Sequence, residues 1–582
     1  MAFFREPAYT KNEVTTWAIP NYWDAIALVL VFALIVMLAW SAKQMTATYH
    51  VGEAIPLSLA PSNLPAYAFR TVLRMFIALL CSLIFTFIFG TWAAKNKHAE
   101  RLIIPIIDIL QSVPILSFLS ISVTGFILLF PNSMFGPECA SIFVIFTSQV
   151  WNMTLSFYQG VKTVPNDLEE AANIFRLSAW QRFWRIEVPF SMQGLLWNMM
   201  MSMSGSWFFV TASEAISVAN QNITLPGIGS YIALAIEQAN STAIIYAIIA
   251  MLVVIFLYDQ LLFRPLVYWI ERFKEEQDED VESSRAWIVS LFQQTKLLRR
   301  SSALFSAFGN IFINLSIFNW RSTVEVAKRS SRRFRISPVV VYYVAVTAIF
   351  IIAFFAVGKF IFSKVDFAEI EHAFLLGIFT GIRVMVLIGI SSLIWVPVGV
   401  WIGLRPRIAT KVQPIVQFLA AFPANLLFPI VAMLVVKWHL NVEIWVAPLM
   451  VLGTQWYILF NVIAGASALP KELKLAAANF RVKGWLWWRR LVLPGIAPYF
   501  ITGAITAAGG AWNASIVAEV INWGAVKLRA TGLGAYIAEH TARGDFQRIA
   551  LGTIVMCLLV FIVNRLVWRP LYNLAVDRFK LD

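Results

Sequence analysis

The stretch PNDLEEAANIFRLSAWQRFWRIEVP, residues 165–189, has a second copy in the chain, PKELKLAAANFRVKGWLWWRRLVLP, at residues 470–494. Each copy is polar and charged, yet each lies between long apolar runs. In a membrane protein, such a segment is a loop with a short helix that a partner outside the bilayer can bind. We call them the first and second polar loops. The identical positions are Pro165/Pro470, Leu168/Leu473, Ala171/Ala476, Ala172/Ala477, Phe175/Phe480, Arg176/Arg481, Trp180/Trp485, Arg185/Arg490 and Pro189/Pro494.

The composition indicates a membrane protein. Of the 582 residues, 59% are hydrophobic and only 13% are charged, whereas soluble domains carry about 25% charged residues. Many apolar segments have the length of about 20 residues that a helix needs to cross a hydrocarbon core of about 30 Å. The alternating segments of about ten residues that build membrane β-barrels are not visible in the sequence. We therefore predict an all-α membrane protein.

The net charge of +14 is explained by the Lys and Arg that accumulate in cytoplasmic loops of membrane proteins. Nucleic-acid-binding motifs are absent from the sequence, so we expect no nucleic-acid partner. The three cysteines, Cys81, Cys139 and Cys557, are scattered singly and suggest neither a disulfide framework nor a metal site. The phosphate-binding motif G-x-x-x-x-G-K-[ST] is also absent. We expect no metal and no cofactor in this chain.

About twelve transmembrane helices are predicted in two sets of six. The basic residues Lys95, Lys97 and Arg101 follow the second span and mark the cytoplasmic side, so both termini are expected in the cytoplasm. Proline residues 105 and 114 predict a kink or an interruption in the third span. The predicted spans lie near residues 23–40, 66–94, 102 onward, 139–160, 190–213, 242–263, 339–362, 373–403, 414–436, 443–465, 495–517 and 546–568.

The similarity of the two halves extends well beyond the polar loops. Upstream of the loops, one alignment register pairs Arg74/Arg383, Gly90/Gly399, Trp92/Trp401, Pro105/Pro414 and Pro114/Pro423. A second register pairs the loops and continues through Trp207/Trp512, Glu214/Glu519, Gly227/Gly532, Gly229/Gly534, Tyr231/Tyr536, Arg264/Arg569 and Pro265/Pro570. An even number of spans in each unit makes the repeats parallel.

We divide the chain into three parts. A first unit covers residues 1–270, a cytoplasmic linker covers residues 271–337, and a second unit covers residues 338–582. The linker opens with an acidic run and then turns basic. Its mixed apolar and basic middle section is compatible with binding to the anionic inner leaflet, and a solvated linker remains an equal alternative.

The polar loops resemble the cytoplasmic loop of the permease subunits of ATP-binding-cassette importers. The signature of that family is E-A-A-x-x-x-G, followed by a hydrophobic-x-L-P ending. The first loop has Glu170-Ala171-Ala172 and ends IEVP, and the second has Leu475-Ala476-Ala477 and ends LVLP. Two departures are visible: an arginine replaces the family's glycine in both loops, and the second loop lacks the glutamate. The resemblance implies a fused two-unit permease of a type I importer with a cytoplasmic coupling helix in each unit.

Segments after the loops refine the resemblance. GSWFFVTASEAI at 205–216, AWNASIVAEVI at 511–521 and TGLGAYI at 531–537 look like the pattern of permeases for nitrate, taurine, alkylsulfonate and bicarbonate. This likeness implies a small anionic solute. Fused twelve-span permeases for ferric iron or thiamine are the alternative, and a secondary transporter with parallel repeats is a further one.

The resemblance also implies partners and a location. ATP and Mg would be bound by two separate ATP-binding subunits, expected to form a homodimer, and the permease itself would not be catalytic. An external substrate-binding protein would deliver the solute to a multi-pass protein of the bacterial inner membrane.

The resemblance places coupling to the ATP-binding subunits on residues of both polar loops. Aromatic side chains dominate protein interfaces, and alanines allow a close approach. Because the second loop has lost its glutamate, we hypothesise that the two loops bind their partners unequally. The expected coupling residues are Glu170, Ala171, Ala172, Phe175, Arg176, Ala476, Ala477, Phe480 and Arg481.

Two arginines lie inside predicted spans, and two glutamates lie at the outer ends of theirs. Ionisable groups are costly in a bilayer and face the bundle interior or a cavity. Arg74 and Glu214 lie in the first unit, and Arg383 and Glu519 take the corresponding positions in the second. One interpretation is an arginine pair that attracts an anion. The other, which we favour, is a structural Arg–Glu pair within each unit.

Overall fold

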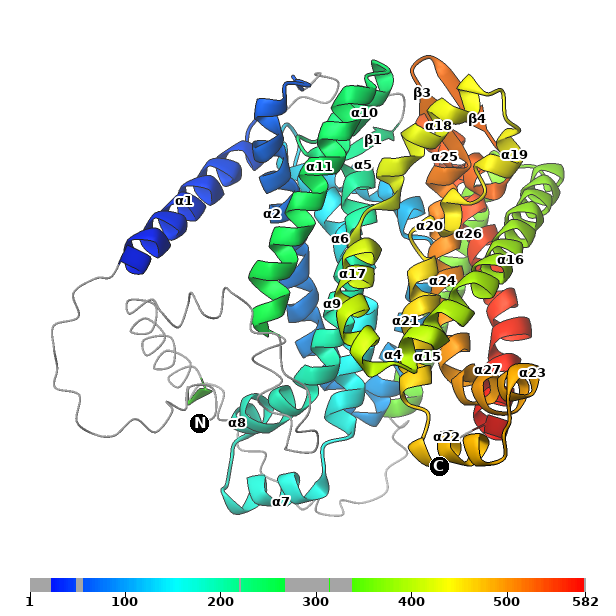
Figure 1. The fold of residues 1–582 in the computed structure, drawn as a ribbon. Coiled ribbons are helices and arrows are strands. Elements are labelled where there is room, and N and C mark those ends of the chain that lie inside the picture. Colours follow the sequence, from blue (N-terminus) through cyan, green and yellow to red (C-terminus); the bar gives the residue numbers. More distant parts are fainter. Residues whose placement is uncertain (1–21, 49–55, 219–220, 267–312, 315–337, 580–582) are drawn as a thin grey trace.

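The computed structural model describes residues 22–48, 56–218, 221–266, 313–314 and 338–579, which form a bundle of helices (Figure 1). Within these residues, six helices are long and apolar enough to cross a membrane, or up to eight if each strongly bent pair counts as one span. The predicted all-α membrane class is confirmed. Apart from residues 313–314, the predicted linker lies outside the described residues. The six helices are Pro61–Lys95, Phe135–Lys162, Ser241–Leu266, Phe367–Gly403, Gly484–Ala518 and Phe546–Ala575.

The first half contains helices at the predicted spans and a short β-hairpin. Its elements are α1 (Tyr22–Met45), α2 (Leu64–Phe85), α3 (Thr91–Lys95), α4 (Lys97–Ser112), α5 (Leu119–Leu129), α6 (Phe135–Lys162), α7 (Asn166–Ile174), α8 (Ala179–Arg182), α9 (Val188–Glu214), β1 (Ala215–Val218), β2 (Gln221–Thr224), α10 (Ile228–Glu237) and α11 (Ser241–Tyr258).

The second half repeats this order. Its elements are α15 (Pro338–Phe362), α16 (Phe367–Gly403), α17 (Pro406–Ala421), α18 (Phe428–Lys437), α19 (Val442–Trp445), α20 (Leu449–Leu452), α21 (Gln455–Ser467), α22 (Lys471–Asn479), α23 (Gly484–Trp487), α24 (Leu493–Ala518), β3 (Val520–Trp523), β4 (Val526–Arg529), α25 (Leu533–Arg543), α26 (Phe546–Val563) and α27 (Arg569–Phe579).

The third span is interrupted at a proline in both halves, at Pro114 in the first and at Pro423 in the second. Val113, with φ −79° and ψ 134°, and Phe422, with φ −70° and ψ 125°, leave the helical conformation. Each precedes a proline, whose ring clashes with a helical conformation of the residue before it. In the second half the two segments meet at a bend of 70°. The earlier proline of each span stays inside α4 or α17.

The tenth predicted span, near residues 443–465, is not one helix. It is divided into α19, α20 and α21, with a bend of 46° before α21, whereas the corresponding α6 is a continuous helix of 28 residues. Pro448 lies at the start of α20 and Gly453 at its end, where proline lacks a backbone donor and glycine is a weak helix former.

One antiparallel hairpin follows the fifth span of each half, and in the first half the sequence predicted only an external stretch there. β1 pairs with β2, and β3 pairs with β4. Gly524 has a φ of 56° in the second hairpin turn, a backbone conformation that glycine adopts at no steric cost. The hairpins lie at the end of the bundle opposite α7 and α22 (Figure 1).

The interrupted third spans join the two halves. Leu116, from the break in the first half, packs in the apolar core formed mainly by the second half, and Leu426 packs in the core of the first half. Polar contacts support both crossings: the Ile115 N–H donates to Asn513 Oδ1 over 2.6 Å, and Asn425 Nδ2 donates to Thr211 Oγ1 over 2.8 Å.

Close packing of α24 on α21 provides a test of this fold. A methyl group on Gly503 would lie 2.7 Å from the carbonyl oxygen of Tyr457, whereas one on Gly509 would meet nothing within 4 Å. We expect Gly503→Ala to destabilise the protein by about 1–3 kcal/mol because it overpacks the contact. Gly509→Ala is the matched control, expected to stabilise α24 by up to about 1 kcal/mol. Thermal unfolding in detergent measures both, and equal melting temperatures would contradict the packing.

Candidate functional site

The first and second polar loops each form a nine-residue helix, α7 and α22. Figure 1 shows both helices at the same end of the molecule. Each helix is followed by an arginine in the left-handed conformation, Arg176 with φ 49° and Arg481 with φ 52°. A glycine adopts this conformation without strain, and the related family signature has a glycine at this position. The departure from the signature thus changes the residue but keeps the backbone turn.

An aromatic side chain is exposed directly after each loop helix. Phe175 is 76% exposed and Phe480 is 82% exposed. Glu170, Arg176 and Arg481 are also exposed.

The alanines were expected to be exposed so that a partner could approach closely, but they are buried or half-buried. Ala172 is 2% exposed and packs against its own chain, while Ala171, Ala476 and Ala477 are half-buried. Their small side chains bring the loop helices close to the rest of the protein.

A cluster of four charged side chains lies at the other end of the first half. Arg74 Nε and Nη2 donate to the Glu138 carboxylate over 2.6 and 2.8 Å, and Arg74 Nη1 donates to Glu214 Oε1 over 2.6 Å. Arg70 Nη2 donates to Glu138 over 2.9 Å, and its Nη1 donates to Gln44 over 2.8 Å. Arg74 and both glutamates are completely buried. The cluster ties together α2, α6 and α9.

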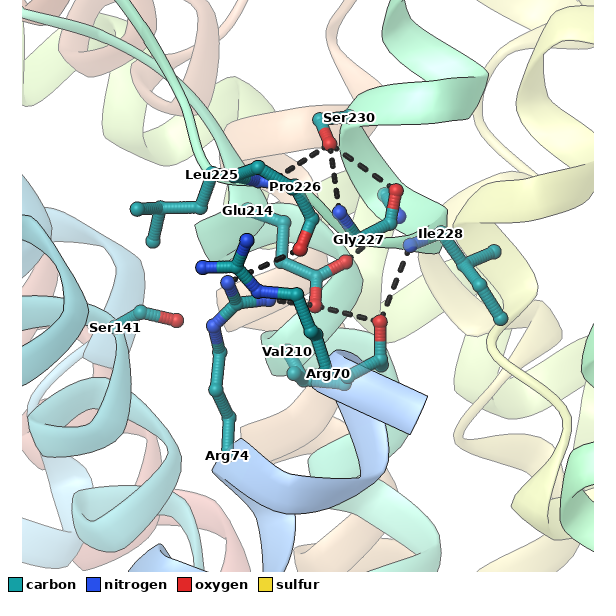
Figure 2. A network of polar contacts seen from close by, with 12 residues as sticks. Arg70, Arg74, Ser141, Val210, Glu214, Leu225, Pro226, Gly227, Ile228 and Ser230 are labelled. Carbon is teal, nitrogen blue, oxygen red and sulfur yellow. Dashed lines mark hydrogen bonds and ion pairs between the residues drawn. The ribbon is translucent and has the colours of Figure 1, made fainter. Parts of the chain in front are cut away.

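The carboxylate of Glu214 has further donors around it (Figure 2). The Thr71 hydroxyl donates to Oε1 over 2.7 Å, and the Gly229 N–H donates to Oε2 over 2.7 Å. A methyl group on Gly227 would lie 2.2 Å from Glu214 Cδ. The G-I-G segment therefore holds the start of α10 against a buried carboxylate, and only a residue without a side chain fits at Gly227.

The second half has a smaller and more exposed version of this cluster. Arg383 donates to Glu519 over 2.9 Å and to Glu443 over 2.7 Å. The side chain of Arg383 is 14% exposed, and that of Glu443 is 43% exposed. Arg70 has no counterpart, because the aligned residue is Phe379. The first cluster therefore balances two arginines with two glutamates, whereas the second has one arginine for two glutamates.

The structure brings together the Arg74/Glu214 and Arg383/Glu519 pairs that the sequence singled out. Sequence reasoning missed Glu138 and Glu443, which complete the clusters. Glu138 and Glu443 are aligned with each other in the second register. A comparison of the two halves could therefore have found them from the sequence.

A cavity of about 80 Å³ lies between the two halves. Its wall is mostly apolar, with hydroxyl groups from Ser204, Thr454 and Tyr457. The charged clusters do not line it. The lining residues are Ser204, Gly205, Phe208, Phe209, Ala420, Phe422, Ala424, Leu449, Met450, Gly453, Thr454, Tyr457, Gly510 and Ala514. In the part of the chain that the structure describes, no group of three His, Cys, Asp or Glu residues could hold a metal ion.

The protein family described as binding-protein-dependent transport system inner membrane component matches the chain twice, over residues 86–264 and over residues 395–569. The chain belongs to this family. The double match confirms the fused two-unit permease predicted from the repeat.

Individual relatives of the permease include proteins named for small solutes. The bicarbonate transport system permease protein CmpB of Synechococcus elongatus is 26% identical over 31% of this chain and 61% of its own length. The nitrate import permease protein NrtB of Synechocystis is 23% identical over 40% of this chain and 84% of its own length. The glycine betaine permease OpuAB of Bacillus subtilis is 22% identical over 33% of this chain and 63% of its own length.

Arg74 is completely buried and Arg383 is partly exposed in the permease, so the stabilities of variants at these two positions can be compared. Arg74→Gln removes the partner of two fully buried carboxylates, and we expect a loss of about 3–5 kcal/mol in stability. Arg383→Gln also leaves one buried carboxylate, Glu519, without a cation, as Arg74→Gln does for Glu214. It is expected to cost less because Arg383 is 14% exposed and Glu443 remains hydrated, so water can replace part of the lost contact. The melting temperatures of the two purified variants in detergent measure this difference. A larger loss for Arg383→Gln would contradict the structural role assigned to the buried cluster.

Proposed function

We propose that the chain forms the translocation pathway of an ATP-driven importer for a small anion. The cavity between the two halves is the observation that carries the proposal. Its wall combines residues of α9 from the first half with residues of α20, α21 and α24 from the second. A solute at this position would be reached from either end as the halves move relative to each other.

The lining supports an anion rather than a metal cation. The Tyr457 hydroxyl can donate a hydrogen bond to an oxyanion, whereas the Ser204 and Thr454 hydroxyls donate to the backbone carbonyls of Met200 and Val451. None of the described residues that line the cavity is a carboxylate. Iron and other hard cations prefer carboxylate oxygens, so the lining disfavours a ferric-iron permease. The names of the bicarbonate and nitrate relatives agree with a small anion of this kind.

The loop helices support coupling to separate ATP-binding subunits. Exposed aromatic residues such as Phe175 and Phe480 are typical anchors of protein interfaces. In the first half, α7 leads through α8 into α9, and α9 carries Ser204 and Phe208 of the cavity wall. Movement of a docked subunit would therefore reach the cavity along one continuous segment of chain.

Uptake by the assembled complex tests the proposal. The permease is reconstituted in liposomes with its ATP-binding subunits and substrate-binding protein, and ATP-dependent uptake of labelled nitrate and bicarbonate is measured. Gly205→Trp fills the cavity, where a methyl group would already lie 3.1 Å from the Tyr457 hydroxyl, and we expect uptake to fall by more than ~10-fold. Gly125→Trp is the control, because Gly125 is exposed and lies outside the cavity. Equal uptake by the two variants would contradict the pathway.

The loss of the glutamate in the second loop gives a separate prediction. Glu170 is exposed on α7, and Leu475 is 65% exposed at the same position of α22. We expect Glu170→Ala to reduce stimulated ATPase activity more than Leu475→Ala, because a lost charge-assisted contact costs about 1.5–3 kcal/mol. Equal effects of the two substitutions on the reconstituted complex would disprove the inequality of the loops.

A further inference from the structure

A chain of ion pairs connects the first loop helix to the end of α3. Glu169, on α7, contacts Arg182, the last residue of α8. Arg182 Nε lies 3.2 Å from Glu187 Oε1, and Lys95 Nζ lies 2.8 Å from Glu187 Oε2. The chain therefore begins on the surface that is proposed to meet an ATP-binding subunit. It ends on the helix that closes the second span.

Glu187 is the centre of this chain. Its side chain is 2% exposed, whereas those of Lys95 and Arg182 are 41% and 28% exposed. A buried carboxylate is costly unless cations neutralise it, and here one cation lies beside each oxygen. Glu187 is also the last residue of the π-helical turn 183–187 that joins α8 to α9. The two contacts of Glu187 differ from ordinary surface ion pairs, which are exposed on both sides and contribute little. The contact of Glu169 with Arg182 is of that ordinary kind, with side chains 43% and 28% exposed.

The second half lacks this series of ion pairs. The alignment places Leu404 opposite Lys95, Lys474 opposite Glu169, Trp487 opposite Arg182 and Val492 opposite Glu187. Leu404, Trp487 and Val492 all belong to the apolar core of the second half. Phe183 and Val188 also pack in the apolar core of the first half, so the corresponding junction combines apolar packing with buried charges in the first half and has apolar side chains in place of those charges in the second.

We propose that Glu187 is a positioning residue that makes α7 and the end of α3 move together, and that the two halves respond unequally to ATP for this reason. The inference rests on the proposed importer function. The ion pairs of Glu187 resist separation of the helices they join through attraction of opposite charges, although neither carboxylate oxygen forms a hydrogen bond. The second half has no charged residue opposite Lys95, Arg182 or Glu187, so we expect it to transmit the same movement less directly.

Distance measurements on the complete complex test this inference. Nitroxide labels are placed on Trp92→Cys and Trp401→Cys, which are equivalent positions that are each 52% exposed, after the three native cysteines are replaced by serine. The change in their separation on addition of ATP and vanadate is compared with the ATPase rate. Lys95→Gln removes one end of the chain but leaves Arg182 beside the buried Glu187, so the variant is expected to fold.

We expect Lys95→Gln to reduce the ATP-dependent distance change at least about two-fold while the ATPase rate is maintained. Arg182→Gln should reduce the distance change by a similar factor. The double variant should be no worse than either single variant, because both break one series of contacts. A merely structural role would instead lower the amount of folded complex and leave the distance change per complex intact.

Glu100→Gln is the matched control. It breaks the ion pair of Glu100 with Lys162, also 2.8 Å long and in the first half, but outside the chain. It should leave the distance change unaltered. If the parent complex is active and the Lys95→Gln variant keeps the full distance change, this inference is overturned and the proposed function is not. A parent complex without ATPase activity would overturn the proposed function and this inference with it.

Discussion

The buried guanidinium of Arg74 is the interaction on which the first half depends. It joins Glu138 of α6 and Glu214 of α9 to α2 through three short contacts. Charges inside an apolar bundle are tolerated only when they remain paired. The three helices therefore cannot separate at this end without exposing an unpaired charge to an apolar environment.

The repeat conserves geometry more strongly than chemistry. Both halves hold an arginine, two glutamates and a threonine at corresponding places, but only the first cluster is sealed from solvent. At the opposite end, Glu187 is surrounded by cations, while its counterpart Val492 is packed among apolar side chains. A fused chain can accumulate such differences because its two halves always assemble with each other.

Much of this architecture could be predicted from the sequence, because hydropathy and the repeat are strong signals. The helix positions, the break at Pro114 and the pairing of Arg74 with Glu214 follow from residue type and alignment. The division of the tenth span was missed, although Pro448 and Gly453 mark it, because the apolar run as a whole has the length of a single spanning helix. The cavity depends on how side chains from distant helices meet, and neither register contains that information. The exchange of Glu187 for Val492 is visible in the alignment, but its importance appears only when its cations are seen beside it.

The crossed third spans have a consequence for how this protein is made. Leu116 belongs to the first half by sequence, yet it completes its packing in the core of the second. During synthesis, this part of the first half must wait until the later helices have entered the membrane. A tether between the halves raises their effective concentration and shortens that wait. Fusion of the two units is thus an advantage in biogenesis, since the early helices acquire their missing neighbours from the same polypeptide.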